Sequence, residues 1–308
     1  MEPLKIGMVG LDTSHCPAFT RLLNDAGDPF HVPGAQVTVA FPGGSPDFPL
    51  SRDRVGPYTE QLAREFGVRM VTSCEEVAEE ADAILLTAVD GRAHFPLFRK
   101  LASYRKPVFI DKPFALSVTD AFGMARLAAR CGTPLMSASS LRWAEPLVDA
   151  LCDRQSGIPV GADCHGPLNL ELTQPGLFWY GIHTVEMLYA VMGKGCTRVT
   201  AFRQEEHELV VGEWKDGRLG TIRGNRTGNM DFGVMIHGKE GSRWVDASEG
   251  RKPWYAGLME RVIPFFLSGT PSVDLQETLE IVQFIEKANE SRETGSPVPL
   301  ERVKEGLA

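Results

Sequence analysis

The chain has 308 residues, of which 43% are hydrophobic and 23% charged, and its formal net charge at pH 7 is −8. This composition predicts a folded protein with a sizeable core and excludes a disordered chain. Because the net charge is negative and no extended basic patch is present, we expect no nucleic-acid partner and favour small-molecule ligands.

Two further classes are disfavoured by the sequence. No apolar run approaches the length of a membrane span, and the first strand begins almost at Met1 without a secretion signal. We therefore expect a cytoplasmic protein with no membrane partner. The six cysteines are scattered and form no Cys-x-x-Cys pair, which argues against a zinc site or a disulfide framework. No metal is expected.

The first half of the chain alternates predicted strands with predicted helices. Strands are expected at residues 5–10, 36–41, 68–72, 83–89, 107–110 and 134–138. Helices are expected at residues 17–24, 58–66, 75–80, 95–104 and 119–130. Repeated βα units of this length predict a parallel, doubly wound α/β sheet with right-handed crossovers. Residues 42–57 are expected to form an inserted loop that covers a ligand or partner, or a tolerated surface insertion.

After about residue 140 the pattern changes. A helix is expected up to about residue 152, and β-rich runs follow at 168–172, 197–202, 208–214, 219–224 and 234–237. These runs predict an open, mostly antiparallel sheet, covered by a helix at 181–192. Helices at 255–267 and 275–291 complete the chain. We therefore predict a Rossmann-like domain at 1–140 and an α+β domain at 141–308, whose C-terminal helix packs back toward the first domain.

The turn after the first strand reads Gly10-Leu11-Asp12-Thr13-Ser14-His15. A dinucleotide site usually has Gly-x-Gly-x-x-Gly here, so that the backbone can approach a pyrophosphate. Only Gly10 fits, since Asp12 and His15 take the other glycine positions. A carboxylate at Asp12 repels pyrophosphate unless it turns away. The hydroxyls of Thr13 and Ser14 can donate to a phosphate or merely cap the helix.

The second strand ends at Phe41, where an NAD site usually has an acidic residue for the ribose. None is present. Ser45, Arg52 or Arg54 could meet a 2′-phosphate if the following segment folds back, which favours NADP.

Polar residues follow three later strands of the predicted sheet. Val89 ends the fourth strand, with His94 shortly after it, and Asp111-Lys112-Pro113 follows the fifth. Arg142 follows the sixth strand. Carboxyl ends of parallel strands meet at one crevice, so His94 and Arg142 are candidates for substrate binding. Arg142 could equally pair with a carboxylate between the domains.

Lys112 and His183 are the candidate catalytic residues. A lysine at a strand end points into the crevice, and a histidine exchanges protons near neutral pH. Together they suggest a cation beside the cofactor and a proton-transfer group. Taken alone, each residue is better explained as a solvated lysine or as a histidine that caps or packs a helix.

These motifs resemble the glucose–fructose oxidoreductase / inositol dehydrogenase / MocA (Gfo/Idh/MocA) family over nearly the whole chain. Residues 5–10 resemble its opening strand, and Asp111-Lys112-Pro113 resembles its Glu-Lys-Pro signature. Gly181-Ile182-His183 resembles its Gly-x-His, and residues 277–300 resemble its C-terminal helix and tail.

The resemblance implies an NAD(P)-dependent oxidoreductase acting on a sugar, polyol or related hydroxy compound, with NAD or NADP as cofactor. The nicotinamide would lie near Val89 and Lys112, with Asp111 and Pro113 beside it. His183 would take the hydroxyl proton, and Lys112 would hold the hydroxyl. Relatives form oligomers through the open sheet, which implies a homodimer or homotetramer.

Three departures indicate a divergent subfamily. The glycine pattern is incomplete, the acid near Phe41 is missing, and Trp179 stands where the family commonly has an aspartate, four residues before His183. Tyr180 could supply the missing polar group or could form a hydrophobic wall. Two alternatives follow: a dinucleotide-using lyase or glycosidase-type enzyme, and a non-catalytic sensor or binding protein that kept the fold.

Overall fold

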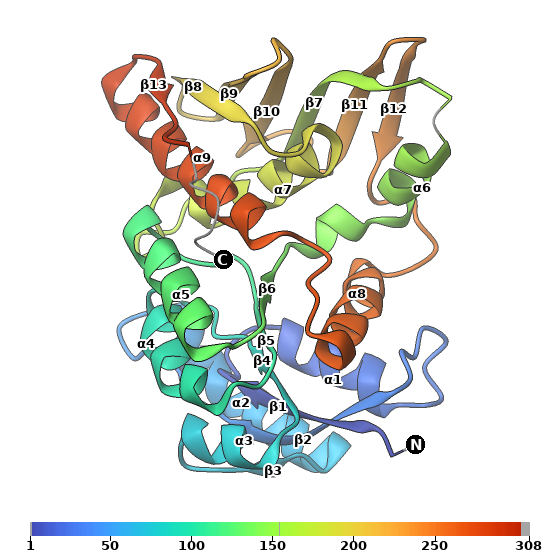
Figure 1. The fold of residues 1–308 in the computed structure, drawn as a ribbon, viewed down its shortest axis with the longest axis vertical. Coiled ribbons are helices and arrows are strands. Elements are labelled where there is room, and N and C mark those ends of the chain that lie inside the picture. Colours follow the sequence, from blue (N-terminus) through green and yellow to red (C-terminus); the bar gives the residue numbers. More distant parts are fainter. Residues whose placement is uncertain (1, 154, 303–308) are drawn as a thin grey trace.

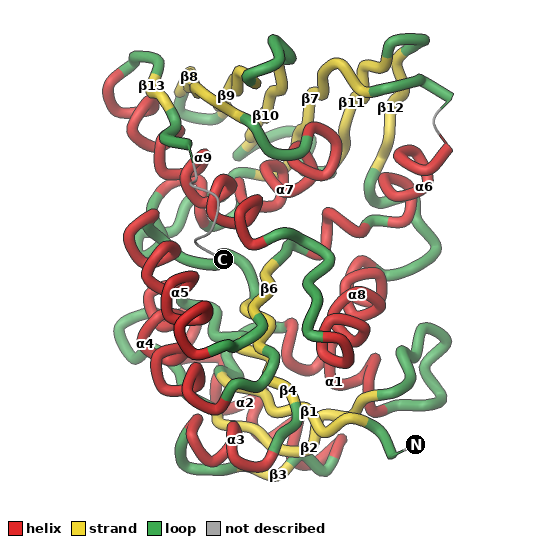
Figure 2. The backbone as a smooth tube through the Cα atoms, in the orientation of Figure 1, coloured by secondary structure: helices red, strands yellow, loops and turns green. Residues whose placement is uncertain are grey.

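The computed structural model describes residues 2–153 and 155–302, and it contains two sheets at opposite ends of the molecule (Figure 1). Helices cover both sides of the first sheet, whereas α7 (Gly181–Met192) runs along one face of the second (Figure 2). The predicted combination of a doubly wound sheet and an α+β part is confirmed.

The first sheet has six parallel strands in the order β3-β2-β1-β4-β5-β6. The strands are β1 (Leu4–Val9), β2 (Ala35–Phe41), β3 (Arg69–Met70), β4 (Ala83–Leu86), β5 (Val108–Ile110) and β6 (Leu135–Ser137). The helices between them are α1 (His15–Asn24), α2 (Pro49–Phe66), α3 (Cys74–Glu80), α4 (Gly91–Leu101), the short 3-10 helix η1 (Ala102–Tyr104) and α5 (Val118–Cys131). The strand order reverses between β1 and β4, which is the place where such sheets bind ligands.

Local sequence explains where several of these helices begin and end. The side chains of Ser73, Asp90 and Ser117 accept backbone N–H groups at the first turns of α3, α4 and α5. Gly67 and Gly132 end α2 and α5 in the left-handed conformation, with φ of 67° and 71°. The strand–helix alternation is therefore encoded locally as well as by burial.

The predicted loop at 42–57 is wrong in its second half, because α2 already begins at Pro49. Only Ser51 and Leu62 are buried on this 18-residue helix, so it has almost no apolar stripe for a sequence pattern to reveal. Gly56 and Pro57 within it are typical loop residues, which added to the error. A proline at the first helical position starts the helix. Residues 42–48, which we call the β2–α2 segment, are the part that lies outside regular structure.

The second sheet has the order β12-β11-β7-β10-β9-β8-β13, and its neighbours are antiparallel except for the parallel pair β7 and β10. Its strands are β7 (Pro159–Pro167), β8 (Cys196–Arg203), β9 (His207–Trp214), β10 (Leu219–Asn225), β11 (Gly233–Gly238), β12 (Ser242–Asp246) and β13 (Val298–Pro299). The elements η2 (Ser140–Trp143), α6 (Glu145–Asp153) and η3 (Gly176–Phe178) connect the two sheets and α7.

The predicted strand at 168–172 is also wrong. That stretch contains only an isolated bridge between Glu171 and Gln174, and the strand lies just before it, in β7. The alternating leucines at 168, 170 and 172 imitate a strand pattern, yet Leu170 and Leu172 are exposed. Strand β7 was not predicted because its sequence includes glycine, proline and aspartate, which have low strand propensity.

Two C-terminal helices join the sheets. Helix α8 (Trp254–Ser268) packs on α1, and its Met259, Val262 and Phe266 share an apolar cluster with β1 and β2. Helix α9 (Leu275–Thr294) packs on α7 and β8 of the second sheet and on α5 of the first. The Glu286 carboxylate accepts the Val118 N–H at 2.8 Å, tying α9 to the start of α5. Throughout the described ranges, every helix is too short or too polar to cross a lipid bilayer.

Candidate active site

Lys112 and His183, predicted from distant parts of the sequence, lie in one place in the structure. Lys112 follows β5 at the carboxyl edge of the first sheet, and His183 lies on the first turn of α7. The Lys112 Nζ is 5.5 Å from the centre of the Trp179 ring. Aromatic contacts then run from Trp179 through Tyr180 to His183, with ring centres 6.2 and 5.8 Å apart. The site therefore lies between the two sheets.

Lys112 is half-buried against an aromatic face. Burial lowers the pKa of its amine, and the adjacent Asp111 carboxylate only partly opposes that effect. The Trp179 ring supplies a cation–π contact to this amine. A ring face stabilises the charged amine less than a carboxylate would, so Lys112 is able to release a proton more readily than a surface lysine.

His183 is 8% exposed, and its Nδ1 lies 2.6 Å from the Ser139 Oγ. No described residue hydrogen-bonds its Nε2, which leaves that atom for a ligand. Burial holds the pKa of His183 well below its usual value, and the positive charges of Lys112 and His15 act in the same direction. The imidazole is therefore neutral near pH 7.

Tyr180 caps the start of α7 and packs edge-on against the His183 ring. Its ring is half-buried between Trp179 and His183. This position places it beside the pair, as the sequence predicted, and its catalytic role stays a prediction. The Phe232 ring closes the other side of His183 at 5.7 Å. Phe232 was not foreseen, because nothing near it in the sequence indicates chemistry.

Asp111 is buried and connects the turn after β1 with the end of β5. One carboxylate oxygen pairs with the His15 ring, and the other accepts the Lys112 backbone N–H at 2.8 Å. Burial alone would raise the pKa of Asp111, but His15 and Lys112 outweigh it and lower the pKa. His15, at the third glycine position of the turn, is thus occupied by Asp111 and packs on Phe19 and Tyr255.

Gly10 and Asp12 show what the incomplete glycine pattern does. A Cβ on Gly10, where φ is 89°, would lie 2.6 Å from the Ala88 backbone, so glycine is required for the approach of β1 to β4. Asp12 is fully buried, and its carboxylate accepts the Val89 N–H at 2.8 Å and the Ser51 hydroxyl at 2.5 Å. Burial raises the pKa of Asp12. The carboxylate is turned into the protein, toward β4 and α2.

The β2–α2 segment lies across the carboxyl ends of the central strands. The Pro42 carbonyl accepts the Leu11 N–H at 2.7 Å, at the end of β1. Arg92 on α4 pairs with Asp47 of the segment at 2.8 Å and with Asp90 at 2.7 Å, beyond the end of β4. The segment therefore runs from β2 past β1 toward β4, which is the course of a dinucleotide in doubly wound folds.

At its far end the segment reaches the second half of the molecule. Phe48 is fully buried and meets the Trp179 ring edge-on at 5.8 Å. A second contact joins the two halves of the molecule, because the side-chain amide of Gln174 donates to Asp90, just after β4, at 2.9 Å. The edge at Val89 and Lys112 stays the predicted place of a nicotinamide ring.

The other residues predicted for the cofactor line the same turn and edge. Thr13 is buried, and its Oγ accepts the His15 N–H at 3.4 Å, while Ser14 is exposed at the start of α1. Phe41 is half-buried at the end of β2, and Val89 and Pro113 are buried at the strand ends. Their contacts with a cofactor stay predictions.

The two residues predicted to bind substrate are already paired within the protein. The buried Arg142 pairs with Glu186 at 2.7 Å and also with Glu277, so of its two predicted roles the structure shows the pairing with carboxylates. His94 has no exposed surface, and its nitrogens lie 2.9 Å from the Pro113 carbonyl and 2.8 Å from the Ala88 carbonyl. Neither His94 nitrogen is free for a substrate.

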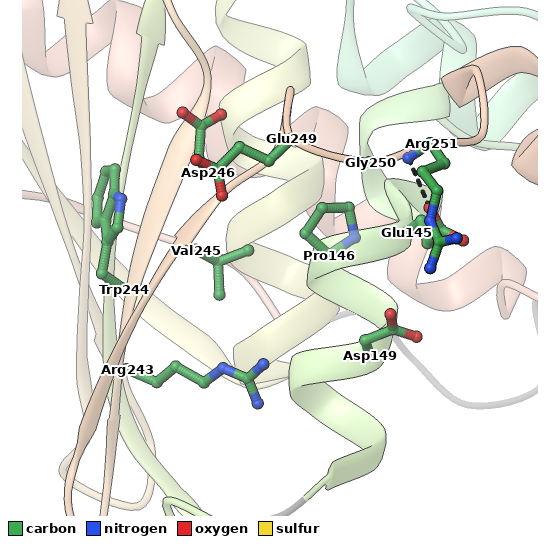
Figure 3. Close-up of a pocket in the computed structure, with 10 residues that line it drawn as sticks. All are labelled: Glu145, Pro146, Asp149, Arg243, Trp244, Val245, Asp246, Glu249, Gly250 and Arg251. Atoms are coloured by element: carbon green, nitrogen blue, oxygen red, sulfur yellow. Dashed lines mark hydrogen bonds between the residues drawn. The ribbon is translucent and has the colours of Figure 1, made fainter.

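A separate cavity of about 350 Å³ lies between α6 and β12 (Figure 3). Two of its charged residues hold neighbouring elements together, because Glu145 accepts the Arg251 N–H at 2.8 Å and Arg243 pairs with Asp153 at 2.7 Å. None of the candidate catalytic residues lines it. Within the part of the chain that the structure describes, no cluster of three or more His, Cys, Asp or Glu side chains could hold a metal ion.

Comparison with known proteins agrees with this geometry. Residues 53–139 match the profile of Gfo/Idh/MocA, an oxidoreductase family with an NAD-binding Rossmann fold. No curated protein matches the chain in sequence. The fold and the matched segment define the class, an oxidoreductase with an NAD-binding Rossmann domain. Over this matched segment the chain is similar to the Gfo/Idh/MocA family.

Solved structures share the fold over nearly the full length. A probable dehydrogenase from Thermotoga maritima is 19% identical, with 98% of this chain and 100% of that chain covered and a TM-score of 0.78. Myo-inositol dehydrogenase from Lactobacillus casei, solved with NAD(H) and myo-inositol, is 14% identical, with 98% of each chain covered and a TM-score of 0.77. An oxidoreductase from Agrobacterium radiobacter, solved with NAD+, L-tartaric acid and magnesium, is 18% identical. The match covers 97% of this chain and 98% of that chain, with a TM-score of 0.74.

Proposed function

We propose that this oxidoreductase transfers hydride between a nicotinamide and a hydroxyl-bearing carbon of a sugar, polyol or related compound. The observation that carries the proposal is the meeting of Lys112 and His183 between the two sheets, with both side chains largely withdrawn from water. Related structures are described with myo-inositol or L-tartaric acid, which are both hydroxy compounds.

Lys112 and His183 would have different roles at the reacting oxygen of the substrate. A bound nicotinamide dinucleotide supplies the group that accepts or donates hydride. Burial lowers the pKa of Lys112, which brings its proton exchange closer to neutral pH, and burial keeps the His183 imidazole uncharged there. The positive form of Lys112 stabilises negative charge that develops on the oxygen, because charges act strongly where water is excluded.

Cofactor choice and assembly belong to the same proposal. We infer that NAD binds, with NADP admitted by Arg52 or Arg54 at the start of α2. The substrate is a small molecule, and a homodimer or homotetramer forms through the second sheet, whose Phe202, Leu219 and Trp244 are exposed. A cytoplasmic location is supported by the six free cysteines.

Trp179 supports a second candidate function. Without an aspartate at this position, the pair at Lys112 and His183 is compatible with a lyase or glycosidase-type enzyme that holds its dinucleotide. The buried Asp12 supports a third, a sensor that binds no cofactor. Cofactor absorbance in gently purified protein separates the third candidate from the others, and product analysis separates the first two.

The proposal is tested in two stages. NADH and NADPH are first titrated by fluorescence, and an absence of saturable binding by the native protein would refute it. A panel of sugars, polyols and hydroxy acids is then assayed for nicotinamide reduction.

With a substrate in hand, Lys112→Ala, His183→Ala and the double variant are compared. Each single change is expected to lower kcat by about 10²–10⁴-fold, with losses far from additive. Lys100→Ala and His237→Ala are matched controls, because both side chains are exposed and lie in surface ion pairs. Full activity in folded His183→Ala protein would remove that residue from the mechanism.

A further inference from the structure

Ser139 makes an uncommon pair of contacts at the candidate active site. It lies directly before η2, has no exposed surface, and its Oγ accepts the Leu141 backbone N–H at 3.2 Å as the cap of that short helix. The same Oγ lies 2.6 Å from the Nδ1 of His183. Capping thus fixes where the hydroxyl oxygen lies, and this oxygen contacts the imidazole at its Nδ1 edge.

The hydrogen-bond inventory of a hydroxyl decides the direction of this contact. A serine Oγ–H has one hydrogen to donate and can accept two bonds. The Leu141 N–H already occupies one acceptor position, and no other acceptor in residues 2–153 or 155–302 bonds the hydroxyl. If His183 donated from Nδ1, the hydroxyl hydrogen would be buried without a partner, which is unfavourable. The hydroxyl therefore donates to Nδ1.

A neutral imidazole with an acceptor at Nδ1 carries its hydrogen on Nε2. The titratable groups that act on His183 are Lys112 after β5, His15 on α1 and Asp111. Burial lowers the pKa of His183, Lys112 and His15 lower it further when they are charged, and Asp111 opposes these effects. Protonation of both nitrogens is disfavoured, so the ring presents an N–H, and not a lone pair, from its unoccupied nitrogen.

We propose that Ser139 is a positioning residue that holds His183 in the Nε2–H tautomer, so that His183 donates a hydrogen bond to the substrate oxygen while Lys112 exchanges the proton. In alcohol oxidation the substrate O–H bond breaks and its proton joins the neutral amine of Lys112. The electron pair of the broken O–H bond would form the carbon–oxygen double bond, and the carbon–hydrogen pair would leave as hydride to a bound nicotinamide. His183 keeps its hydrogen throughout.

Trp179, four residues before His183, offers no hydrogen-bond acceptor to the imidazole and packs under Lys112. The hydroxyl of Ser139 then determines the tautomer. The roles of Lys112 and His183 toward a substrate rest on the proposed function, whereas the tautomer itself does not.

The tautomer is read directly by nitrogen NMR of protein labelled with ¹⁵N-histidine. His183→Gln removes one of the histidine signals and so assigns it. We expect the native spectrum at neutral pH to show an unprotonated Nδ1 and a protonated Nε2, and Ser139→Ala to shift the ring toward a mixture of tautomers. Ser139→Thr, which keeps the hydroxyl, should restore the native pattern. A protonated Nδ1 in the native protein would overturn the proposal.

Kinetics test the roles once a substrate is known. Glutamine keeps a side-chain N–H donor near the Nε2 position but cannot act as a base, so His183→Gln should retain far more activity than His183→Leu. If His183 were the base, both variants would lose about 10²–10⁴-fold, and the proposal would fail. Ser139→Ala is expected to lower kcat by about tenfold with little change in KM, since one hydrogen bond is lost.

The two failures are distinguishable. If no compound in the panel reduces the nicotinamide, the proposed function fails, and the NMR result still decides the tautomer. If hydride transfer is observed with a protonated Nδ1, the proposed function stands and the assignment of Ser139 is refuted.

Discussion

Replacing Arg142 by methionine should destabilise the protein strongly. The Arg142 side chain is 9% exposed and pairs with Glu186 and Glu277, which are 4% and 15% exposed. Removing one partner of a buried pair leaves an uncompensated charge and costs about 3–5 kcal/mol. With unfolding entropy of about 2.1 cal/mol/K for each of the 308 residues, this corresponds to a Tm lower by about 5–8 K.

The stability that Arg142→Met loses should depend on pH in a defined direction. Burial raises the pKa of Glu186 more than Arg142 lowers it, and loss of the arginine raises that pKa further. The folded state then binds a proton more tightly than the unfolded state. Stability is retained in acid and lost as the pH rises through the folded-state pKa. Arg142→Met should therefore differ least from the native protein at acidic pH and most at neutral pH.

Denaturant unfolding followed by circular dichroism measures both effects. Arg198→Met is the matched control, because Arg198 and Glu213 form a pair that is 52% and 35% exposed and worth at most about 1 kcal/mol. Arg142→Met/Glu186→Gln should recover part of the loss. A loss below about 1 kcal/mol that is independent of pH would refute this reasoning. A raised KM at unchanged stability would instead assign Arg142 to substrate binding.

Three further outcomes are expected. Ser51→Ala removes the hydroxyl that accepts the Ser45 N–H of the β2–α2 segment and donates to Asp12, so it should loosen that segment and speed NADH association in stopped-flow fluorescence. Slower association would contradict the course described for the segment. Replacing Arg52 and Arg54 together by alanine should weaken NADPH more than NADH, since only NADPH carries the extra phosphate, and an unchanged ratio of Kd values would exclude both arginines. Cys152 is the exposed cysteine and should react first with a thiol reagent, so Cys152→Ser should abolish the fast phase of labelling.

The sequence predicted best what depends on local pattern. The buried runs of β1, β4 and β5 gave the doubly wound sheet, because fully covered parallel strands are apolar on both faces. Lys112 was found because it follows such a strand. The start of helix α2 was not predicted because that helix lacks an apolar stripe. Strand β7 was not predicted because it has few strand-forming residues.

The inner contacts of the site could not be read from the sequence. His15 and Asp111 are 96 positions apart, and Ser139 and His183 are 44 apart. Each pair depends on how the helices pack on the sheet, which no periodicity encodes. The incomplete glycine pattern did signal that the turn is unusual, and the buried carboxylate of Asp12 is the structural form of that departure.

Helix α8 has a consequence for how the chain is made. One face of the first sheet, with Phe19 of α1, is covered by Met259, Val262 and Phe266, which are synthesised more than a hundred residues after the last strand of that sheet. At ribosomal rates of about 5–20 residues per second, the emerging domain keeps this apolar surface open for about 6–24 s. The nascent chain is therefore a natural client for chaperones during that interval, and its first half completes its own core only after most of the second half has left the ribosome.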